Sequence, residues 1–456
     1  MQNEQEAEPG HVHFRFSQAD LDRLAARLVG VALDRGAHDV SARAFESDAL
    51  NVAVRRGCAD VVTHARTQGM AINIYRNQGL GVATTTDLSE PALLAAVETA
   101  WRMASHTSSD PCHGPADTAW LESSPPPLDL FHPVSPRPGD AIDLAARVES
   151  AALAASPDAF QCDASMHIRH QHWALATSRG FAGGYARSLY ELGCTAIAKG
   201  DDGMQASQWS RRSVAMPDLD PPETIGRRAA ERAVALLGAR RLQTGAWPVL
   251  FEAPVAASLI GSFLATITGQ AQYRRQSFLP DSLGHIVLAD HVGLYETPHA
   301  PRGIASAPFD AEGVRITGGD LVADGVLKRY LLSAYSARKL GMSSSGHADG
   351  AHNLTVTSRH ASDDDDFAGM LRRLHTGLVV TNLLGRGVNP VTGDYSRGAV
   401  GFWVERGMIQ FPVHEVTIAG NLKTMLRNIV AVGTDIHEGH IRTGSILIDR
   451  MHIAGQ

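Results

Sequence analysis

The alternation of apolar and polar positions predicts helices that flank long strands in the first hundred residues. Residues 17–36 should form an amphipathic helix, because leucines and valines recur there at helical spacing and Ser17 can cap its N-terminus. A second helix is expected over residues 90–106, with a proline in its first turn. Between the two helices, DALNVAVRRG and MAINIYRNQGLGVATTTDL alternate apolar and polar residues around glycine breaks. Such runs are typical of strands joined in a β-meander.

A change in composition divides the chain into segments. Pro, Ser and Gly dominate residues 107–139, which we interpret as a linker or long irregular loop after an N-terminal α+β domain of residues 1–106. Residues 140–246 follow as a middle α+β segment, in which strand-like runs fill residues 161–215. Residues 247–456 are rich in glycine and in strand-like runs, which predicts a β-rich C-terminal domain.

The same patterns place further elements within these segments. Helices are expected at residues 140–156, 221–238, 251–268 and 420–432. Strands of the C-terminal domain are expected in HIVLADH, VRITGGDLVADGVLKRYLLS, LVVTNLL, AVGFWVERGMIQFPV and ILIDRMHI. The predicted fold class is α+β, with an N-terminal region of helices on an antiparallel sheet and a large, mainly antiparallel β domain at the C-terminus.

Composition narrows the classes of function. The chain has 456 residues, 44% of them hydrophobic and 20% charged, and its net charge of −7 gives no basic footprint for nucleic acid. No run approaches ~20 apolar residues, and the polar N-terminus is unlike a signal peptide. We therefore expect a cytoplasmic protein without membrane contact. A disulfide framework or a thiolate zinc site is not expected, because no CxxC pair occurs among Cys58, Cys112, Cys162 and Cys194.

Familiar motifs for hydrolytic or nucleotide chemistry are absent from the sequence. The chain contains no HExxH or HExxxH zinc motif, no GxSxG nucleophile elbow and no glycine-rich phosphate loop. His414 and Glu415 stand in a β-branched run, so they are expected on opposite faces of a strand. His437 and His440 are weak metal candidates, because they are only three residues apart and the glycine between them indicates a loop.

A second group of histidines, His167, His170 and His172, occurs in a strand-like run. On a strand, His170 and His172 would share one face and His167 would lie on the other. No carboxylate or thiol in the same run completes a metal site, so surface or partly buried histidines are expected there. The sequence leaves the role of this group open.

The run GDYSRGA is a candidate contact with substrate or with a partner subunit. A tight turn is expected, since its glycines allow a positive φ or a close backbone approach. An aspartate in such a turn can accept hydrogen bonds from backbone N–H groups, and the arginine can pair with a carboxylate. The candidate residues are Gly393, Asp394, Tyr395, Ser396, Arg397 and Gly398.

The C-terminal third resembles a known family. The run GRGVNPVTGDYSRGAVGFWVERGMIQFPVHEVTIAGNLKTMLRNIVAVGTDI and the terminal GSILIDRMHIAGQ are similar to the end of the PmbA (TldE) branch of the TldD/PmbA family, once called modulators of DNA gyrase. Upstream, PVLFEAPVAASLIGSFLATITG and YRRQSFLPDSLG resemble the same branch. The resemblance covers nearly the whole chain.

This resemblance implies a cytoplasmic TldD–TldE metalloprotease that cleaves peptides and unfolded proteins, with roles in peptide maturation and antitoxin degradation. In that family, the TldD-type subunit holds zinc with an HExxxH helix and a cysteine near the C-terminus. The counterpart of the helix here is Glu252–Phe263, which contains no histidine, and no cysteine follows Cys194. The resemblance therefore implies no metal cofactor in this chain, zinc in a TldD-type catalytic partner, and a homodimer when the chain is alone.

Two other functions stay open at this point. The first is an autonomous hydrolase with an unrecognised site, either around Asp394, Ser396 and Arg397 or at His437 and His440. The second is a binding or regulatory protein that acts without proteolysis. The sequence assigns neither catalytic residues nor a natural substrate.

Overall fold

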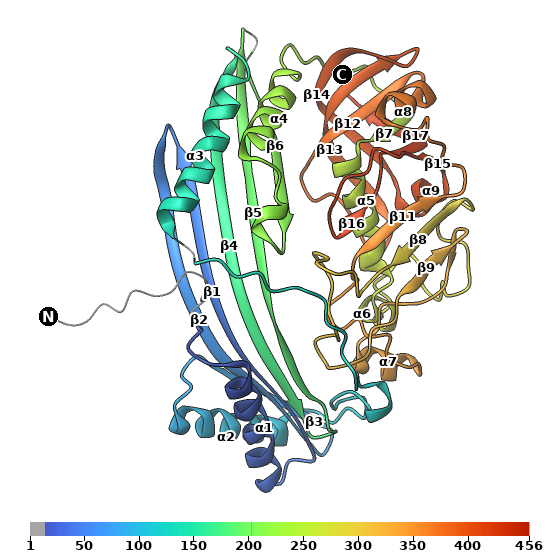
Figure 1. The fold of residues 1–456 in the computed structure, drawn as a ribbon. Coiled ribbons are helices and arrows are strands. Elements are labelled where there is room, and N and C mark those ends of the chain that lie inside the picture. Colours follow the sequence, from blue (N-terminus) through green and yellow to red (C-terminus); the bar gives the residue numbers. More distant parts are fainter. Residues whose placement is uncertain (1–13, 136, 202, 456) are drawn as a thin grey trace, which may run out of the picture.

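The computed structural model describes residues 14–135, 137–201 and 203–455. Two parts stand side by side: a long curved sheet that carries helices, and a C-terminal part in which a barrel-like sheet adjoins a smaller sheet (Figure 1). The predicted α+β class is confirmed, because helices pack on sheets whose strand pairs are mainly antiparallel. None of the described helices combines the length and the apolar composition needed to cross a membrane.

The long sheet runs in the order β3-β2-β1-β4-β5-β6, and every neighbouring pair is antiparallel. Its strands are β1 (Asp39–Arg55), β2 (Cys58–Arg76), β3 (Gly79–Thr85), β4 (Ala159–Thr177), β5 (Ala182–Gly200) and β6 (Gly203–Ser213). Along β1, buried and half-buried residues alternate, which is the period of two for a strand with one covered face. Because β1 pairs with β4, strands that precede and follow the 107–139 segment share one sheet.

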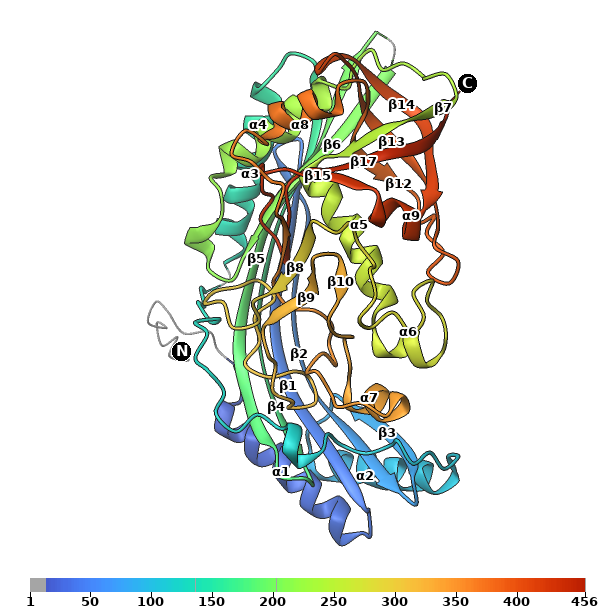
Figure 2. The same ribbon diagram turned by 90° about the vertical axis from the view of Figure 1, so that its right-hand side faces the viewer.

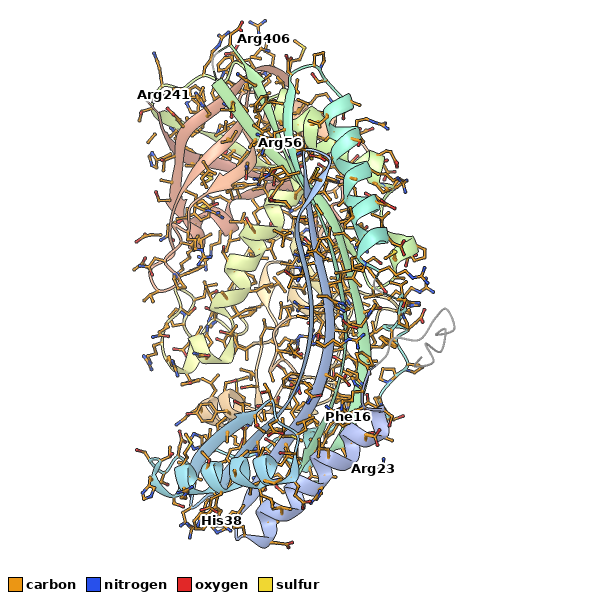
Figure 3. All side chains as sticks on the ribbon, turned by 90° about the vertical axis from the view of Figure 1, so that its left-hand side faces the viewer. Phe16, Arg23, His38, Arg56, Arg241 and Arg406 are labelled. Carbon is orange, nitrogen blue, oxygen red and sulfur yellow. The ribbon has the colours of Figure 1, made fainter. Side chains whose placement is uncertain are left out.

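Helices cover one face of this sheet, and their bounds are α1 (Gln18–Asp34), α2 (Glu90–His106), α3 (Pro138–Ala154) and α4 (Pro222–Val234). The first two pack at one end of the sheet around Leu28 and Ile72. The other two pack at the opposite end around Val148 and Met166. The β1–β2 turn at Arg56 lies at that second end, where its N–H donates to a carboxylate of α3 (Figure 3).

The predicted start of the first helix is confirmed. The Ser17 hydroxyl accepts a hydrogen bond from the Asp20 N–H at 3.2 Å, and the Asp20 carboxylate accepts one from the Ser17 N–H at 2.9 Å. This capping box satisfies two N–H groups at the start of the helix. The helices predicted over residues 90–106, 140–156 and 221–238 correspond to α2, α3 and α4, with ends that differ by up to four residues.

The C-terminal part is built around a barrel-like sheet in the order β14-β13-β12-β7-β17-β15, which closes where β14 pairs with β17. The predicted helix over residues 251–268 is α5 (Ala253–Thr266), whose residues Leu259, Ile260 and Phe263 lie in the core. The strands of the barrel-like sheet are β7 (Gly245–Phe251), β12 (Gly377–Leu384), β13 (Asp394–Glu405), β14 (Met408–Asn421), β15 (Ile429–Val432) and β17 (Ile446–Ala454).

The smaller sheet, in the order β10-β9-β8-β11-β16, lies next to the barrel and in front of the long sheet (Figure 2). Its strands are β8 (Val292–Glu296), β9 (Gly319–Ala323), β10 (Val326–Leu327), β11 (Leu354–Ser358) and β16 (Ile441–Arg442). Short helices connect the strands: α6 (Gly269–Tyr273), α7 (Ala334–Leu340), α8 (Phe367–Leu374) and α9 (Leu422–Arg427).

Two predicted elements of the C-terminal part are wrong. The helix expected over residues 420–432 is only the six-residue α9, because the β-branched run Ile429–Val432 pairs with β17 as strand β15. The strand expected in HIVLADH is irregular, and β8 begins just after it at Val292. In both places the partner strand, rather than the local pattern, decides where the strand forms.

Within the 107–139 segment, the described residues before Pro138 are irregular apart from one short turn (Thr118–Trp120). It is nevertheless held against both parts of the molecule. Arg338 of α7 donates to the carbonyl oxygens of Cys112 and Gly114 at 3.1 and 3.0 Å. The N–H of Ser188, on β5, donates to the carbonyl oxygen of Leu130 at 3.0 Å. The segment therefore ties the long sheet to the C-terminal part.

Candidate functional site

A cleft opens between the long sheet and loops of the C-terminal part. One cavity there has a volume of about 350 Å³, and a neighbouring cavity of about 370 Å³ shares Arg212 and Ile304 with it. We call the first cavity the arginine cleft; it is lined by Arg169, Gln171, Tyr185, Arg187, Leu189, Arg212, Ile304, Ala305, Ser306, Ala307, Asp349, Ala351, His352 and His440.

The period of the strands explains why these sheet residues reach the cleft. Even-numbered residues of β4 and β5, such as Ile168, are buried in the core under α3 and α4. Their odd-numbered neighbours therefore lie on the opposite face. Arg187 stands across the ladder from Gln171, and Leu189 stands across from Arg169. The two arginines are thus diagonal neighbours on the face that borders the cleft.

The arginines of the cleft differ in whether a carboxylate neutralises them. Arg212 donates to both carboxylate oxygens of Glu191, at 2.8 and 3.1 Å. Arg169 and Arg187 have no ion-pair partner among the residues that the structure describes. Burial lowers the pKa of the Arg187 guanidinium below its usual value, and the nearby Tyr185 and Asp349 offset this only in part. The cleft therefore holds a surplus of positive charge.

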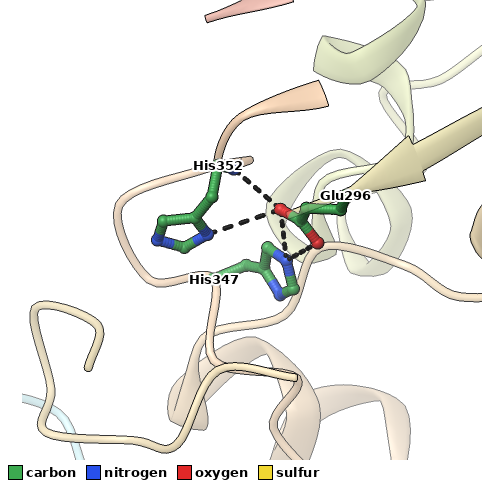
Figure 4. A group of neighbouring side chains, drawn as sticks. All are labelled: Glu296, His347 and His352. Atoms are coloured by element: carbon green, nitrogen blue, oxygen red, sulfur yellow. Dashed lines mark hydrogen bonds and ion pairs between the residues drawn. The ribbon is translucent and has the colours of Figure 1, made fainter. Parts of the chain in front are cut away.

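Glu296, His347 and His352 form a buried charged cluster (Figure 4), and His352 also lines the cleft. Glu296, at the end of β8, is fully buried; its Oε1 accepts the N–H of His352 at 2.7 Å, and its Oε2 accepts Arg329 Nη2 at 2.6 Å. His347 Nε2 lies 2.9 and 3.1 Å from the two oxygens, and His352 Nδ1 lies 3.4 Å from Oε1. Because His352 also lines the cleft, this cluster fixes part of the cleft wall.

Hydrogen bonds decide the charge of Glu296. Burial alone would raise the pKa of its carboxyl group, but hydrogen bonds from His347 and His352 outweigh burial and hold the pKa well below its usual range. The carboxylate is therefore ionised, and Arg329 is its counter-charge. The cluster also brings three potential metal ligands within 4.8 Å of one another, so a metal site is the alternative interpretation.

Arg329 argues against a metal ion in this cluster. Its guanidinium already neutralises Glu296, so a divalent ion would bring uncompensated positive charge into a buried site beside another cation. Among the described residues, no further carboxylate or thiol joins this ligand set. We therefore interpret the cluster as a hydrogen-bonded ion-pair network that holds the loop before β11 against β8.

A third cavity, of about 200 Å³, lies where the other end of the long sheet meets the C-terminal part. Arg43 and Tyr75 from the sheet line it together with Glu312. The Glu312 carboxylate accepts the N–H of Ala334, at the start of α7, at 2.6 Å. Burial raises the pKa of Glu312 to about 7 despite this hydrogen bond. Glu312 therefore titrates near neutral pH at a contact between the two parts.

Helix α5 stands where the family resemblance places a zinc helix, but its residues do not fit a zinc site. The helix contains neither histidine nor cysteine, and Ala256 and Ile260 are buried in the core. Glu252, which precedes the helix, has both carboxylate oxygens bound by Arg232 at 2.5 and 2.7 Å. Without imidazole or thiolate ligands, α5 is a packing helix.

The structure corrects the turn predicted at GDYSRGA. A positive φ, of 81°, occurs at Gly393, whereas Asp394 begins strand β13 and Gly398 lies within the ladder to β14 and β12. The Asp394 carboxylate accepts the hydroxyl of Thr392 at 2.7 Å and the amide of Asn421 at 3.4 Å, rather than backbone N–H groups. Pairing with two neighbouring strands outweighs the local glycine content here.

The side chains of the remaining residues of that run alternate between the two faces of strand β13. Tyr395 is 2% exposed, and burial raises its pKa to about 12, whereas Ser396 is exposed. Arg397 has no ion-pair partner in the described part of the chain, so the predicted pairing with a carboxylate is not formed within this chain. None of the six candidates lines the arginine cleft. Their contact with substrate or partner stays a prediction.

His437 and His440 do not combine with a third ligand into a metal site in the part of the chain that the structure describes. His440 lines the arginine cleft. His437 packs edge-on against Trp209, with ring centroids 5.5 Å apart. His414 and Glu415 lie in strand β14, as predicted, but at a bulge in its ladder to β13, where Glu415 has a φ of 51°.

His170 and His172 share the covered face of β4, and His167 lies on the other face, as predicted. The expectation of surface or partly buried rings is wrong for the first two, which are 0% and 3% exposed. Their partners come from other strands: His172 Nε2 lies 3.3 Å from Glu46, and His170 Nε2 lies 2.9 Å from the Tyr190 hydroxyl. Burial lowers the pKa of His170 to about 4, so its ring is neutral.

Sequence reasoning missed both the arginine cleft and the Glu296 cluster. Glu296 and His347 are 51 positions apart; the histidines in GHADGAHN have the i, i+5 spacing of HExxxH, but alanine stands where that motif has glutamate. The available signal for the cleft was the period-two spacing of polar residues on β4 and β5, at Arg169 and Arg187. That signal identifies a face of a strand but not what lies opposite it.

Comparison with known proteins finds similarity along almost the whole chain. Models of the PmbA/TldA metallopeptidase match residues 40–104 as domain 1, 131–237 as the central domain and 244–455 as the C-terminal domain. The chain is 43% identical over 409 residues to Metalloprotease PmbA of Escherichia coli O157:H7, covering 89% of this chain and 90% of that protein. It is 38% identical over 451 residues to the Metalloprotease PmbA homolog of Haemophilus influenzae, covering 98% and 99%.

Solved structures share the fold. A putative modulator of DNA gyrase from Bacteroides thetaiotaomicron has a TM-score of 0.89 and 24% identity, covering 95% of this chain and 98% of that one. TldE from Thermococcus kodakarensis has a TM-score of 0.82 and 17% identity, covering 95% and 100%. At these identities the likeness shows the fold alone.

Proposed function

The chain belongs to the PmbA/TldA metallopeptidase family, and from that premise we propose that it is the PmbA (TldE)-type subunit of a two-subunit metalloprotease. In this proposal a TldD-type chain supplies the catalytic zinc. The complex cleaves peptides and unfolded proteins in the cytoplasm, with roles in peptide maturation and antitoxin degradation.

The observation that carries the proposal is the composition of α5. A catalytic zinc site uses three protein ligands and an open position for water. Here α5 offers alanine, leucine and isoleucine to the core, and the one carboxylate at its start, Glu252, is bound by Arg232. A hydrolytic zinc therefore has to be held by another chain, and this subunit contributes substrate contact and assembly.

Exposed apolar side chains support association with another chain. On β2, Val61 and Val62 are 48% and 46% exposed. They lie in the half of β2 that pairs with β1 on one side and, among the described residues, with no strand on the other. On the barrel, Met408 and Ile409 are 64% and 44% exposed at the start of β14. Open strand edges and exposed apolar residues favour pairing with a second copy in isolation and with a TldD-type chain when one is present.

The proposal is tested by a peptidase assay on this chain, on a TldD-type chain and on their mixture, with light scattering to give the assembly state. We expect a homodimer without activity, and a stable heterodimer that cleaves an unfolded model protein. A chain that stays monomeric in the mixture and leaves the activity of the TldD-type chain unchanged would contradict the proposal.

A further inference from the structure

The arginine cleft contains two arginines, Arg169 and Arg187, that form no ion pair with a described carboxylate of this chain. We propose that the cleft binds a carboxylate group of a peptide, with Arg187 and Arg169 as the binding residues. The proposal deepens the proposed function, on which it rests for the statement that the ligand is a peptide. The carboxylate specificity follows from the cleft itself.

The neighbouring cavity provides an internal comparison. Each of its remaining arginines has a carboxylate partner: Arg211 with Asp220 at 2.9 Å, Arg302 with Asp129 at 2.6 Å, and Arg442 with Glu438 at 2.8 Å. Arg212, which both cavities share, is paired with Glu191. Among the described arginines of the two cavities, the unpaired ones are Arg169 and Arg187, and both lie in the arginine cleft.

The two unpaired arginines are placed to act on one anion. Diagonal neighbours on adjacent antiparallel strands stand about 7–8 Å apart, within reach of long side chains, and like charges so placed repel each other. Arg187 is half-buried, so its guanidinium has lost part of its hydration, and the charge of Asp349 offsets this loss only in part. A carboxylate between the two removes the repulsion and can accept paired hydrogen bonds from a guanidinium. Arg169 is exposed and stands nearer to solvent.

The rest of the cleft suits a peptide better than a polyanion. Leu189, Ile304 and Ala351 give it apolar wall surface, and its volume of about 350 Å³ is that of a site for a small ligand or a short peptide segment. The carboxylate of the lining, Asp349, would repel a chain of phosphates. The ligand group is therefore a single carboxylate, which a peptide presents either at its C-terminus or on an acidic side chain.

The test uses fluorescence polarisation with the isolated full-length chain and three labelled peptides of one neutral sequence. One peptide has a free C-terminal carboxylate, the second has an amidated C-terminus and one internal glutamate, and the third has an amidated C-terminus and glutamine in its place. We expect the first, the second or both to bind roughly 10- to 100-fold more tightly than the third, the range for charged hydrogen bonds. Equal affinity for all three would overturn the proposal.

Variants locate the site. Arg187→Ala should reduce the affinity for the preferred peptide roughly 10-fold or more. Arg187→Lys should retain part of it, because a lysine keeps the charge but not the paired hydrogen bonds. Arg302→Ala, in the neighbouring cavity, is the matched control and should bind as the wild type does. If Arg302→Ala lost as much peptide affinity as Arg187→Ala, the assignment of the site to the arginine cleft would be contradicted. If a variant fails to fold, the comparison of the three peptides on the wild-type chain still tests the proposal. Because no partner is present, this result is independent of the cleavage assay.

Discussion

Glu312 allows a quantitative test of the contact between the long sheet and the C-terminal part. Burial raises its pKa from 4.5 to about 7. Between these values the folded state keeps the proton and the unfolded state releases it, so the stability from this group is full below pH 4.5 and is lost as the pH rises through about 7. Each pKa unit corresponds to about 1.4 kcal/mol, so ionising Glu312 costs the folded state about 3 kcal/mol.

Glu312→Gln removes this ionisation and keeps an oxygen that can accept the Ala334 N–H. An unfolding entropy of about 2 cal/mol/K per residue gives about 1 kcal/mol per degree for a chain of 456 residues. The melting temperature of the variant minus that of the wild type should therefore grow by about 3 °C between pH 4.5 and pH 8. Differential scanning fluorimetry across this pH range measures both melting temperatures. Groups that titrate alike in the two proteins cancel when one melting temperature is subtracted from the other.

Glu231→Gln, on an exposed position of α4, is the matched control for the loss of one carboxylate. Its melting temperature relative to the wild type, measured at the same pH values, is the baseline for the Glu312→Gln difference. A Glu312→Gln difference that is constant from pH 4.5 to pH 8, or that shrinks, would refute the reasoning, because it would mean that burial does not shift this carboxyl group.

Three further predictions concern metal content, the buried cluster and the barrel. After mild chelation the purified chain should hold less than one zinc per chain by elemental analysis, because α5 has no imidazole or thiolate; one tightly held zinc per chain would contradict this. Glu296→Gln should lower the unfolding free energy by about 3–5 kcal/mol in denaturant titrations, since it leaves Arg329 buried without its counter-charge, and a loss below 1 kcal/mol would argue against the network. Arg397→Ala should lower cleavage by the reconstituted complex with little change in melting temperature, and unchanged cleavage would make that segment purely structural.

Local sequence signals predicted the elements whose stabilising contacts are close in sequence. The first helix follows from Ser17 and the leucine spacing after it, because the cap and the apolar stripe are both local. The same holds for α5, whose apolar residues are continuous along the chain. The helix expected over residues 420–432 failed because its second half pairs with β17, a contact that no local pattern reveals.

The candidate site was less predictable because it depends on contacts between distant segments. The cleft needs the pairing of β4 with β5 and the approach of a loop more than a hundred residues later, around Asp349. The Glu296 cluster joins the end of β8 to the loop before β11, and its counter-charge is Arg329, which no motif connects to it. Sequence patterns placed His167 and His170 on opposite faces of a strand, but only the fold shows which face borders the cleft.

The central claim is that this chain needs a metal-bearing partner for hydrolysis. The most direct measurement is peptide cleavage by mixtures in which one chain at a time is altered. With the wild-type partner, we expect cleavage to survive replacement of His437 and His440 of this chain by alanine. With a partner whose HExxxH glutamate is replaced by glutamine, we expect cleavage to vanish although the heterodimer still forms. Cleavage that persists with the altered partner, or that this chain performs unaided, would contradict the account.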